Sequence, residues 1–126
     1  VVGAVVDRLG PLEIDVEDTV SALVRTSGGP LAHVELDYLA RRYRRGIEVT
    51  GSEATIRLDW ARSVLEVEDA DECRTEPALI PVASSYEQQD AAFAAWVAGG
   101  PPLPVDARTG AASVVLADQI RAAAGR

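Results

Sequence analysis

The segment formed by residues 31–60 alternates between apolar and polar side chains in three successive runs. The apolar positions of these runs are Ala32, Val34, Leu36 and Tyr38, then Ile47 and Val49, then Ala54, Ile56, Leu58 and Trp60. Successive side chains of a strand point to opposite faces, so a period of two is typical of a strand with one buried face. The segment therefore predicts three consecutive strands in a mostly antiparallel sheet.

Two short connections separate these predicted strands. The second consists of Gly51, Ser52 and Glu53, and Gly51 is expected to take the positive φ of a tight hairpin. The first is the basic segment 41–45, which we expect to form the tip of a hairpin.

Further strands are predicted on both sides of this segment. Residues 1–7 form an apolar run that begins at the first residue, which predicts that a longer chain precedes it. Residues 19–26 alternate like a strand, and the turn-forming residues 27–30 lead directly into the central segment. Residues 63–67 are expected to form a short last strand, followed by an acidic loop over residues 68–85.

Two amphipathic, alanine-rich helices are predicted at the C-terminal end. Ser85 is expected to cap the first, which ends at Gly99, and Asp106 to cap the second, which ends near Gly125. Helices of this kind pack closely on a sheet. The fold class predicted is α+β, a two-layer sandwich with a mostly antiparallel open sheet and helices on one face, in a single domain over residues 1–126.

Composition limits the partners and the chemistry. The net charge of -8 disfavours nucleic acid and anionic membranes, and no apolar run approaches the length of a membrane span. The single Cys73 favours a reducing compartment, which predicts a cytoplasmic protein. Every basic residue is arginine, and the absence of lysine excludes Schiff-base chemistry within this chain.

His33, Glu35 and Asp37 form an H-x-E-x-D pattern on one strand face, a spacing from which metal ligands can converge. Polar residues at period two are the ordinary outer face of a one-sided sheet, so we expect no metal there. The chain also contains no G-x-G-x-x-G, no G-x-x-x-x-G-K-[ST] and no G-x-S-x-G. We therefore expect no cofactor bound by this chain alone and no catalytic residue within it.

The basic segment is the candidate substrate site, formed by Arg41, Arg42, Tyr43 and Arg44. Guanidinium groups bind carboxylates and phosphates in a bidentate manner, and the phenol adds a hydrogen bond. The alternative is an exposed hairpin end whose arginines pair with the protein's own carboxylates.

The polar face of the predicted sheet is a candidate oligomer interface. Its proposed residues are His33, Glu35, Asp37, Thr50, Thr55 and Arg57. Leu23 and Leu31 share its parity and would leave apolar area in water, and such a mixture is typical of a protein interface. We expect a two-fold dimer that forms face to face through this sheet.

Three blocks in order resemble the C-terminal domain of the Gfo/Idh/MocA oxidoreductases. They are EDTVSALVRTSGGPLAHVELDYLARRYRRGIEVTGSEATIRLD, YEQQDAAFAAWVAGG and DARTGAASVVLADQIRAAAG. The resemblance implies an NAD(P)-dependent enzyme of sugars, inositols or their derivatives, in which this domain follows a Rossmann domain and supplies a substrate wall and an oligomer interface. The cofactor glycines, the E-K-P lysine and the D-x-x-x-H pair of the family are absent here.

The resemblance leaves two classes of function open. The first is a part of a dehydrogenase whose NAD or NADP is held by the preceding Rossmann domain, and which acts on a small carbohydrate-like molecule. The second is a stand-alone, non-catalytic binding or assembly module with the same fold.

Overall fold

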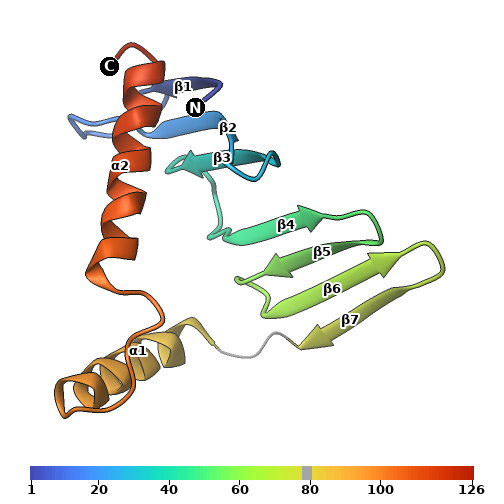
Figure 1. Cartoon of the computed structure of the whole chain (residues 1–126). Coiled ribbons are helices and arrows are strands. Elements are labelled where there is room, and N and C mark those ends of the chain that lie inside the picture. Colours follow the sequence, from blue (N-terminus) through green and yellow to red (C-terminus); the bar gives the residue numbers. More distant parts are fainter. Residues whose placement is uncertain (78–80) are drawn as a thin grey trace. The chain divides into compact units, whose positions relative to one another are not determined.

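The computed structural model describes residues 1–77 and 81–126 and contains seven strands and two helices within them (Figure 1). The chain divides into two compact units, one formed by residues 1–41 with 104–126 and the other by residues 42–103. Their elements are β1 (Gly3–Asp7), β2 (Thr19–Arg25), β3 (Leu31–Asp37), β4 (Gly46–Thr50), β5 (Ala54–Asp59), β6 (Val64–Asp69), β7 (Cys73–Pro77), α1 (Val82–Val97) and α2 (Ala107–Ala123).

The first unit contains a three-stranded antiparallel sheet, here sheet A, in the order β1-β2-β3. β2 is central, so Ala22 pairs with Ala4 on one side and with Val34 on the other. The connection between β2 and β3 turns tightly as expected, and Gly29 takes a φ of 99° there.

Helix α2 covers one face of sheet A. Val6, Val20 and Ala22 of the sheet form a buried cluster with Ile120 of the helix, and Leu116 packs against it. Asp106 caps the helix as predicted, because its carboxylate accepts a 2.8 Å hydrogen bond from the backbone N–H of Thr109. The alternation of β2 places its apolar side chains on one face, and α2 packs on that face, so this unit has two layers with one sheet face covered by the helix.

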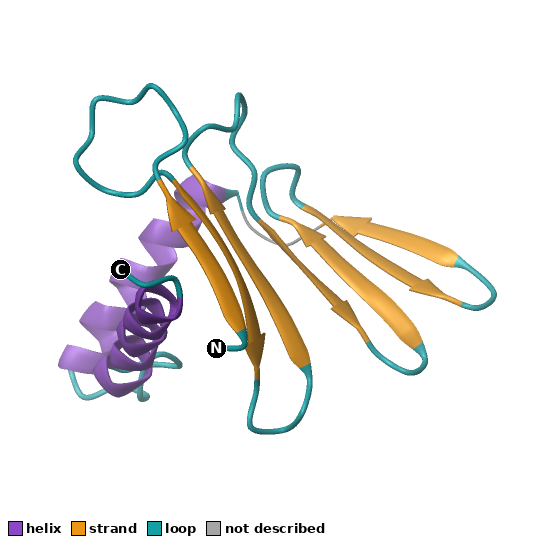
Figure 2. Ribbon diagram, turned by 90° about the horizontal axis from the view of Figure 1, so that it is seen from above, coloured by secondary structure: helices purple, strands orange, loops and turns teal. Residues whose placement is uncertain are grey.

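The second unit contains a four-stranded antiparallel meander, here sheet B, in the order β4-β5-β6-β7 (Figure 2). Alternation gives it one apolar face, on which Ile47 pairs with Leu58, and Ile56 pairs with Val49 and Val67. Ile47 and Val49 are 61% and 53% exposed, so sequence alternation here marks the face without predicting its burial.

Helix α1 begins earlier than expected. Pro81 occupies its N-cap position, and the predicted cap, Ser85, instead lies in the first turn, where its backbone N–H bonds to the carbonyl of Pro81. Proline without an N–H suits a helix start, where backbone donors have no partner within the helix.

The α+β class and the antiparallel pairing are confirmed. The single open sheet is wrong, because β3 and β4 belong to different sheets. Residues 41–45 are therefore a connection between two sheets and not a hairpin tip. Gly51 does not take the positive φ expected of it, although its N–H closes the turn onto the carbonyl of Ala54.

The acidic segment after β6 is also more ordered than the sequence predicts. Cys73–Pro77 forms the edge strand β7, and the turn before it is held by Asp69, whose carboxylate accepts bonds from the N–H groups of Asp71 and Glu72. Residues 78–80 of the predicted loop lie outside the described residues. None of the helices described is both long enough and apolar enough to span a membrane.

Candidate functional site

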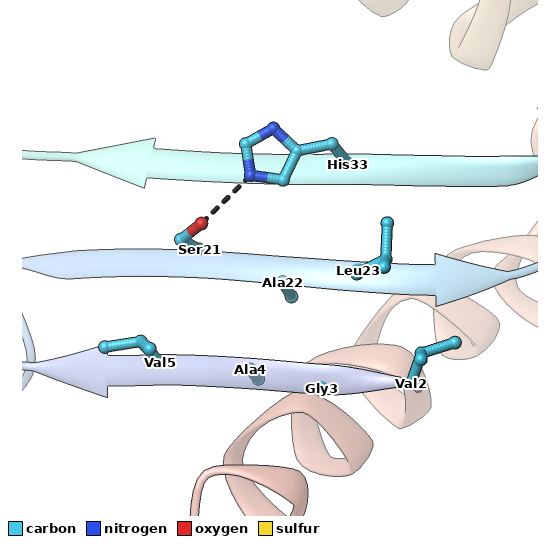
Figure 3. A pocket seen from close by; sticks show the side chains of 8 residues that line it. All are labelled: Val2, Gly3, Ala4, Val5, Ser21, Ala22, Leu23 and His33. Carbon is cyan, nitrogen blue, oxygen red and sulfur yellow. Dashed lines mark hydrogen bonds between the residues drawn. The ribbon is translucent and has the colours of Figure 1, made fainter.

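The face of sheet A opposite α2 carries a shallow depression of about 410 Å³ across all three strands (Figure 3). Its lining residues are Val2, Gly3, Ala4, Val5, Ser21, Ala22, Leu23 and His33. The side chains of Val5, Ser21, Leu23 and His33 stand on this open face, whereas those of Ala4 and Ala22 point to the other side. The depression lies over Gly3, where an added Cβ would meet nothing within 4 Å.

Two polar side chains meet in this depression. The hydroxyl oxygen of Ser21 lies 2.9 Å from Nε2 of His33 on the neighbouring strand, and which atom donates depends on the imidazole tautomer. Glu35 lies on the same face, directly opposite Ser21 in the β2–β3 register. The antiparallel register of β2 and β3 therefore gathers a hydroxyl, an imidazole and a carboxylate on one open surface.

A serine next to a histidine raises the question of nucleophilic catalysis, which needs a donor pair for the developing oxyanion. Ser21 lies on the central strand, whose backbone N–H groups are used in the ladders with β1 and β3. None of those groups is free to stabilise an oxyanion. The arrangement fits recognition, through hydrogen bonds beside apolar contacts, better than acyl transfer.

The sequence predicted His33 and Glu35 on this face but did not single out Ser21, Gly3 or Val5. A signal for Ser21 exists in the sequence. The tight turn over residues 27–30 fixes the hairpin register, and counting back from it places Ser21 opposite Glu35.

The arginine segment lies in the connection between β3 and β4, with Arg41, Arg42, Tyr43 and Arg44 all exposed. Arg45 is held in the second unit, because its guanidinium carbon lies 5.2 Å from the ring centroid of Trp60 and its carbonyl accepts a 2.8 Å bond from the Trp60 backbone N–H. The indole N–H of Trp60 is buried and finds no acceptor within the part of the chain that the structure describes. The segment thus places cations and one unsatisfied donor in the connection and at the adjoining end of sheet B.

The six predicted interface residues do not share one surface within a single sheet. His33, Glu35 and Asp37 lie on β3 of sheet A, whereas Thr50, Thr55 and Arg57 lie on β4 and β5 of sheet B.

The sheet B group is largely engaged with its own neighbours. Arg57 donates to Glu48 at 2.6 Å on one side and to Glu68 at 2.5 Å on the other, and the hydroxyl groups of Thr50 and Thr55 lie 3.4 Å apart. These two carboxylates, Glu68 first, raise the pKa of Arg57 further above its already high value. The guanidinium of Arg57, one of the proposed interface residues, therefore binds two carboxylates within its own sheet.

No group of three or more His, Cys, Asp or Glu side chains within residues 1–77 and 81–126 is placed to hold a metal ion. His33, Glu35 and Asp37 follow one another along a single strand at alternate positions, about 6.7 Å apart.

Comparison of the chain with protein-family models, with curated proteins and with solved structures finds no match. The resemblance noted in the sequence therefore stays a prediction.

Proposed function

We propose that this chain is the non-catalytic C-terminal domain of an NAD(P)-dependent oxidoreductase of the Gfo/Idh/MocA kind, which acts on a sugar, an inositol or a sugar derivative. In this proposal it supplies an assembly surface and part of the substrate wall, and a preceding Rossmann domain holds NAD or NADP. The observation that carries the proposal is the one-sided packing of sheet A: α2 buries one face, and the other face remains open.

The open face supports an assembly role through its composition. Leu23 is 39% exposed, Leu31 53% and Val5 59%, and they alternate with the polar Ser21 and His33. Apolar groups interspersed with polar ones, around a depression, are typical of a protein interface. A homo-oligomer formed through this face is part of the proposal.

The substrate wall in this proposal is the arginine segment. Arg41, Arg42 and Arg44 flank Tyr43 in the sequence, and all four residues are exposed. An anionic substrate, such as a sugar acid or a nucleotide sugar, offers oxygen atoms to which exposed guanidinium groups bind in a bidentate manner.

The sequence predicts a two-layer sandwich with both helices on one sheet face, and the layer formed by α1 belongs to the proposal as well. Ile47 and Val49 of sheet B are exposed, and so are Tyr86 and Phe93 of α1. A sheet face and a helix that are both apolar bury each other in most two-layer folds. We propose that α1 covers the apolar face of sheet B in the assembled enzyme, which we place in the cytoplasm because Cys73 is a lone, exposed thiol.

A stand-alone binding or assembly module is the second candidate. The lack of lysine and of a glycine-rich phosphate loop favours it, since Schiff-base catalysis needs the first and the recognised nucleotide-binding motifs need the second.

The reading frame around this sequence separates the two candidates. The oxidoreductase proposal expects G-x-G-x-x-G and E-K-P upstream in the same frame, and it expects the purified full-length protein to reduce NAD or NADP with at least one member of a panel of sugars, inositols and sugar acids. A start codon at this position, with no such upstream sequence, would leave only the stand-alone module.

A further inference from the structure

Strand β7 forms one edge of sheet B, and all five of its residues are exposed (Figure 1). One side of its backbone pairs with β6, and no strand of the described residues pairs with the other side. An unpaired strand edge presents backbone N–H and C=O groups to which another strand can bind. The edge at β7 is therefore a candidate binding surface that lies outside the open face of sheet A.

The turn before β7 determines which backbone groups of this strand point outward. Asp69 and Glu72 lie opposite each other there, and the N–H of Asp69 donates to the carbonyl of Glu72 at 3.0 Å. Hydrogen-bonded and non-hydrogen-bonded pairs alternate along an antiparallel ladder. Cys73, Thr75 and Pro77 consequently direct their backbone groups away from β6. Proline has no N–H to donate, so its outward position leaves the ladder with β6 complete.

The side chains of β7 are complementary to a reversed copy of the same strand. When Thr75 lies opposite its own copy, an antiparallel pairing of all five residues places Arg74 opposite Glu76 and Cys73 opposite Pro77. Opposite charges that face each other across two antiparallel strands stabilise the pairing, and so do two facing threonines. Because the pairing is symmetric, it contains the pair of Arg74 with Glu76 twice.

Other ways of pairing these edges bring like charges together. A register centred on Arg74 places two guanidinium groups opposite each other, and one centred on Glu76 places two carboxylates opposite each other. The other edge strand of sheet B, β4, would pair over its full length with Glu48 facing Glu48 of the partner subunit. Within sheet B, the full-length pairing that joins opposite charges is thus the one at β7.

We propose that two copies of this chain pair through β7, antiparallel and related by a two-fold axis at Thr75. Thr75 then exchanges two backbone hydrogen bonds with Thr75 of the partner subunit, and the N–H of Cys73 donates to the carbonyl of Pro77 of the partner subunit. Two four-stranded sheets become one continuous sheet, and the symmetric contact closes after two copies. This inference goes beyond the proposed function, because neither the open face of sheet A nor the arginine segment takes part in it.

Arg74 keeps its own ion pair in this arrangement. Its Nη1 donates to the carboxylate of Glu72 at 3.2 Å, and both side chains are about half exposed. A guanidinium carries five N–H groups, so donors remain for Glu76 of the partner subunit.

The size of the contact determines the affinity to expect. A single strand of five residues buries far less than the ~800 Å² that each partner contributes to a standard interface. Pro77 also cannot return a hydrogen bond to Cys73 of the partner subunit, so each outer pair forms one bond where two are usual. The dimer is therefore weak, and its dissociation constant is expected in the range of roughly 0.1–1 mM.

Sedimentation equilibrium of the purified chain, from micromolar to millimolar concentration, tests this pairing. Thr75→Pro removes the two central donors, and it leaves the ladder with β6 intact because this N–H points outward. It is expected to weaken the dimer about tenfold or more with an unchanged circular dichroism spectrum. The difference in mass between the wild type and T75P measures the β7 contact even where sheet A associates as well.

Thr50→Pro is the matched control on the other edge of sheet B. The N–H of Gly51 donates to the carbonyl of Ala54 at 2.9 Å, so the neighbouring Thr50 directs its N–H outward from β4. T50P therefore makes the same chemical change at an equivalent edge position, and it is expected to leave the dimer intact.

A charge exchange tests the register. Arg74→Glu places two carboxylates opposite each other twice, and it is expected to weaken the dimer about fivefold or more. The double variant R74E with E76R exchanges the two charges and is expected to restore the affinity of the wild type.

Three results would overturn the proposal. A wild-type mass equal to that of T75P at millimolar concentration would exclude pairing through β7, while the assembly role of sheet A would stand. Loss of the dimer in T50P but not in T75P would move the contact to β4. A mass that rises past two copies and that both proline variants reduce would indicate head-to-tail pairing of β7 with β4, which contradicts the two-fold axis.

Discussion

Asp18 and Gly10 are joined by a 2.8 Å hydrogen bond from the backbone N–H of Gly10 to Oδ2 of Asp18. The same carboxylate accepts from the N–H of Leu9 at 2.9 Å and from the hydroxyl of Thr19 at 3.0 Å, and the side chain is buried. One carboxylate at the start of β2 therefore ties the loop after β1 to the sheet. A buried carboxylate is tolerated here because its oxygens are satisfied by donors.

These hydrogen bonds to the Asp18 carboxylate predict that the stability of the fold depends on pH. The backbone N–H of Leu9 has the largest effect on the pKa of Asp18 and lowers it below its ordinary value of 3.8. The N–H of Gly10 and the hydroxyl of Thr19 lower this pKa further, whereas burial opposes them. A group whose pKa is lower in the folded state stabilises that state above its unfolded pKa, and this contribution is lost as the pH falls through the folded pKa. The wild type should keep a constant Asp18 contribution from pH 7 to about pH 5 and lose it progressively below pH 4.

Asp18→Asn removes this charge and is expected to lower the urea midpoint at pH 7, because an amide presents only one acceptor oxygen to two backbone donors. Urea titrations at pH 7, 4 and 3 measure the effect, and the difference between variant and wild type should shrink toward pH 3. Asp15→Asn, in the same loop but exposed, is the control. If the difference in urea midpoint between D18N and the wild type were the same at all three pH values, the proposed role of the charged Asp18 carboxylate would be wrong.

Ile120 is the one described residue of α2 that is fully buried, and it packs on Val6 and Val20. Ile120→Ala is expected to cost about 2–4 kcal/mol of the free energy of unfolding, because it leaves a cavity in a core with few other members. Val115→Ala, on the same helix but 54% exposed, should change it little. Chemical denaturation followed by helical circular dichroism distinguishes them, and equal effects would show that α2 does not pack through Ile120.

The local features of this fold could be predicted from the sequence better than its long-range ones. The period of residues 31–37 and the cap at Asp106 follow from neighbouring residues, and the structure contains both. The separation of β3 from β4 could not be predicted, because alternation gives a strand two faces but does not name its neighbour. The strand β7 was missed since CRTEP is polar, and its edge position needs no apolar face.

In the candidate site, too, local features could be predicted from the sequence and contacts between strands could not. The open face and His33 were visible from parity alone, whereas the Ser21–His33 contact depends on the register across a turn. The engagement of Arg57 by Glu48 and Glu68 depends on three strands together, so a pattern within one strand could not indicate it.

Arg57 is expected to make the stability of sheet B sensitive to salt. It lies between Glu48 and Glu68, so Arg57→Gln leaves these carboxylates without their shared cation. All three side chains are solvent-accessible, and the effect should therefore be small and screened by salt. The urea midpoint of R57Q should fall below that of the wild type in 20 mM salt, and the two should converge in 1 M salt (about 3 Å Debye length). A gap that persists in 1 M salt would mean that packing of the arginine stem, and not charge, is lost.

The chain by itself is expected to bind neither NADH nor NADPH. It has no glycine-rich turn that would bring backbone N–H groups to a pyrophosphate, and no lysine. Calorimetry at millimolar cofactor, with a known dehydrogenase as the positive control, should give only the heat of dilution. Saturable binding would place a cofactor site in these residues and would contradict the proposal that a preceding Rossmann domain alone holds NAD or NADP.

Arg41, Arg42 and Arg44 are expected to select an anionic substrate in the full-length enzyme. Their side chains are exposed in the connection between β3 and β4, next to Tyr43. In the proposed substrate wall these guanidinium groups would contact the substrate before and during the reaction alike, so replacement of all three by alanine should raise KM about tenfold or more while kcat changes little. A tenfold change corresponds to about 1.4 kcal/mol of binding free energy, which is modest for three guanidinium groups. Arg74→Ala is the matched control, because Arg74 is an exposed arginine that pairs with Glu72 on the edge of sheet B. Steady-state kinetics with a sugar acid and with its neutral polyol distinguish the outcomes. An equal rise in KM for both substrates would indicate a structural effect. No rise in KM for either substrate would show that these arginines are not part of the substrate wall.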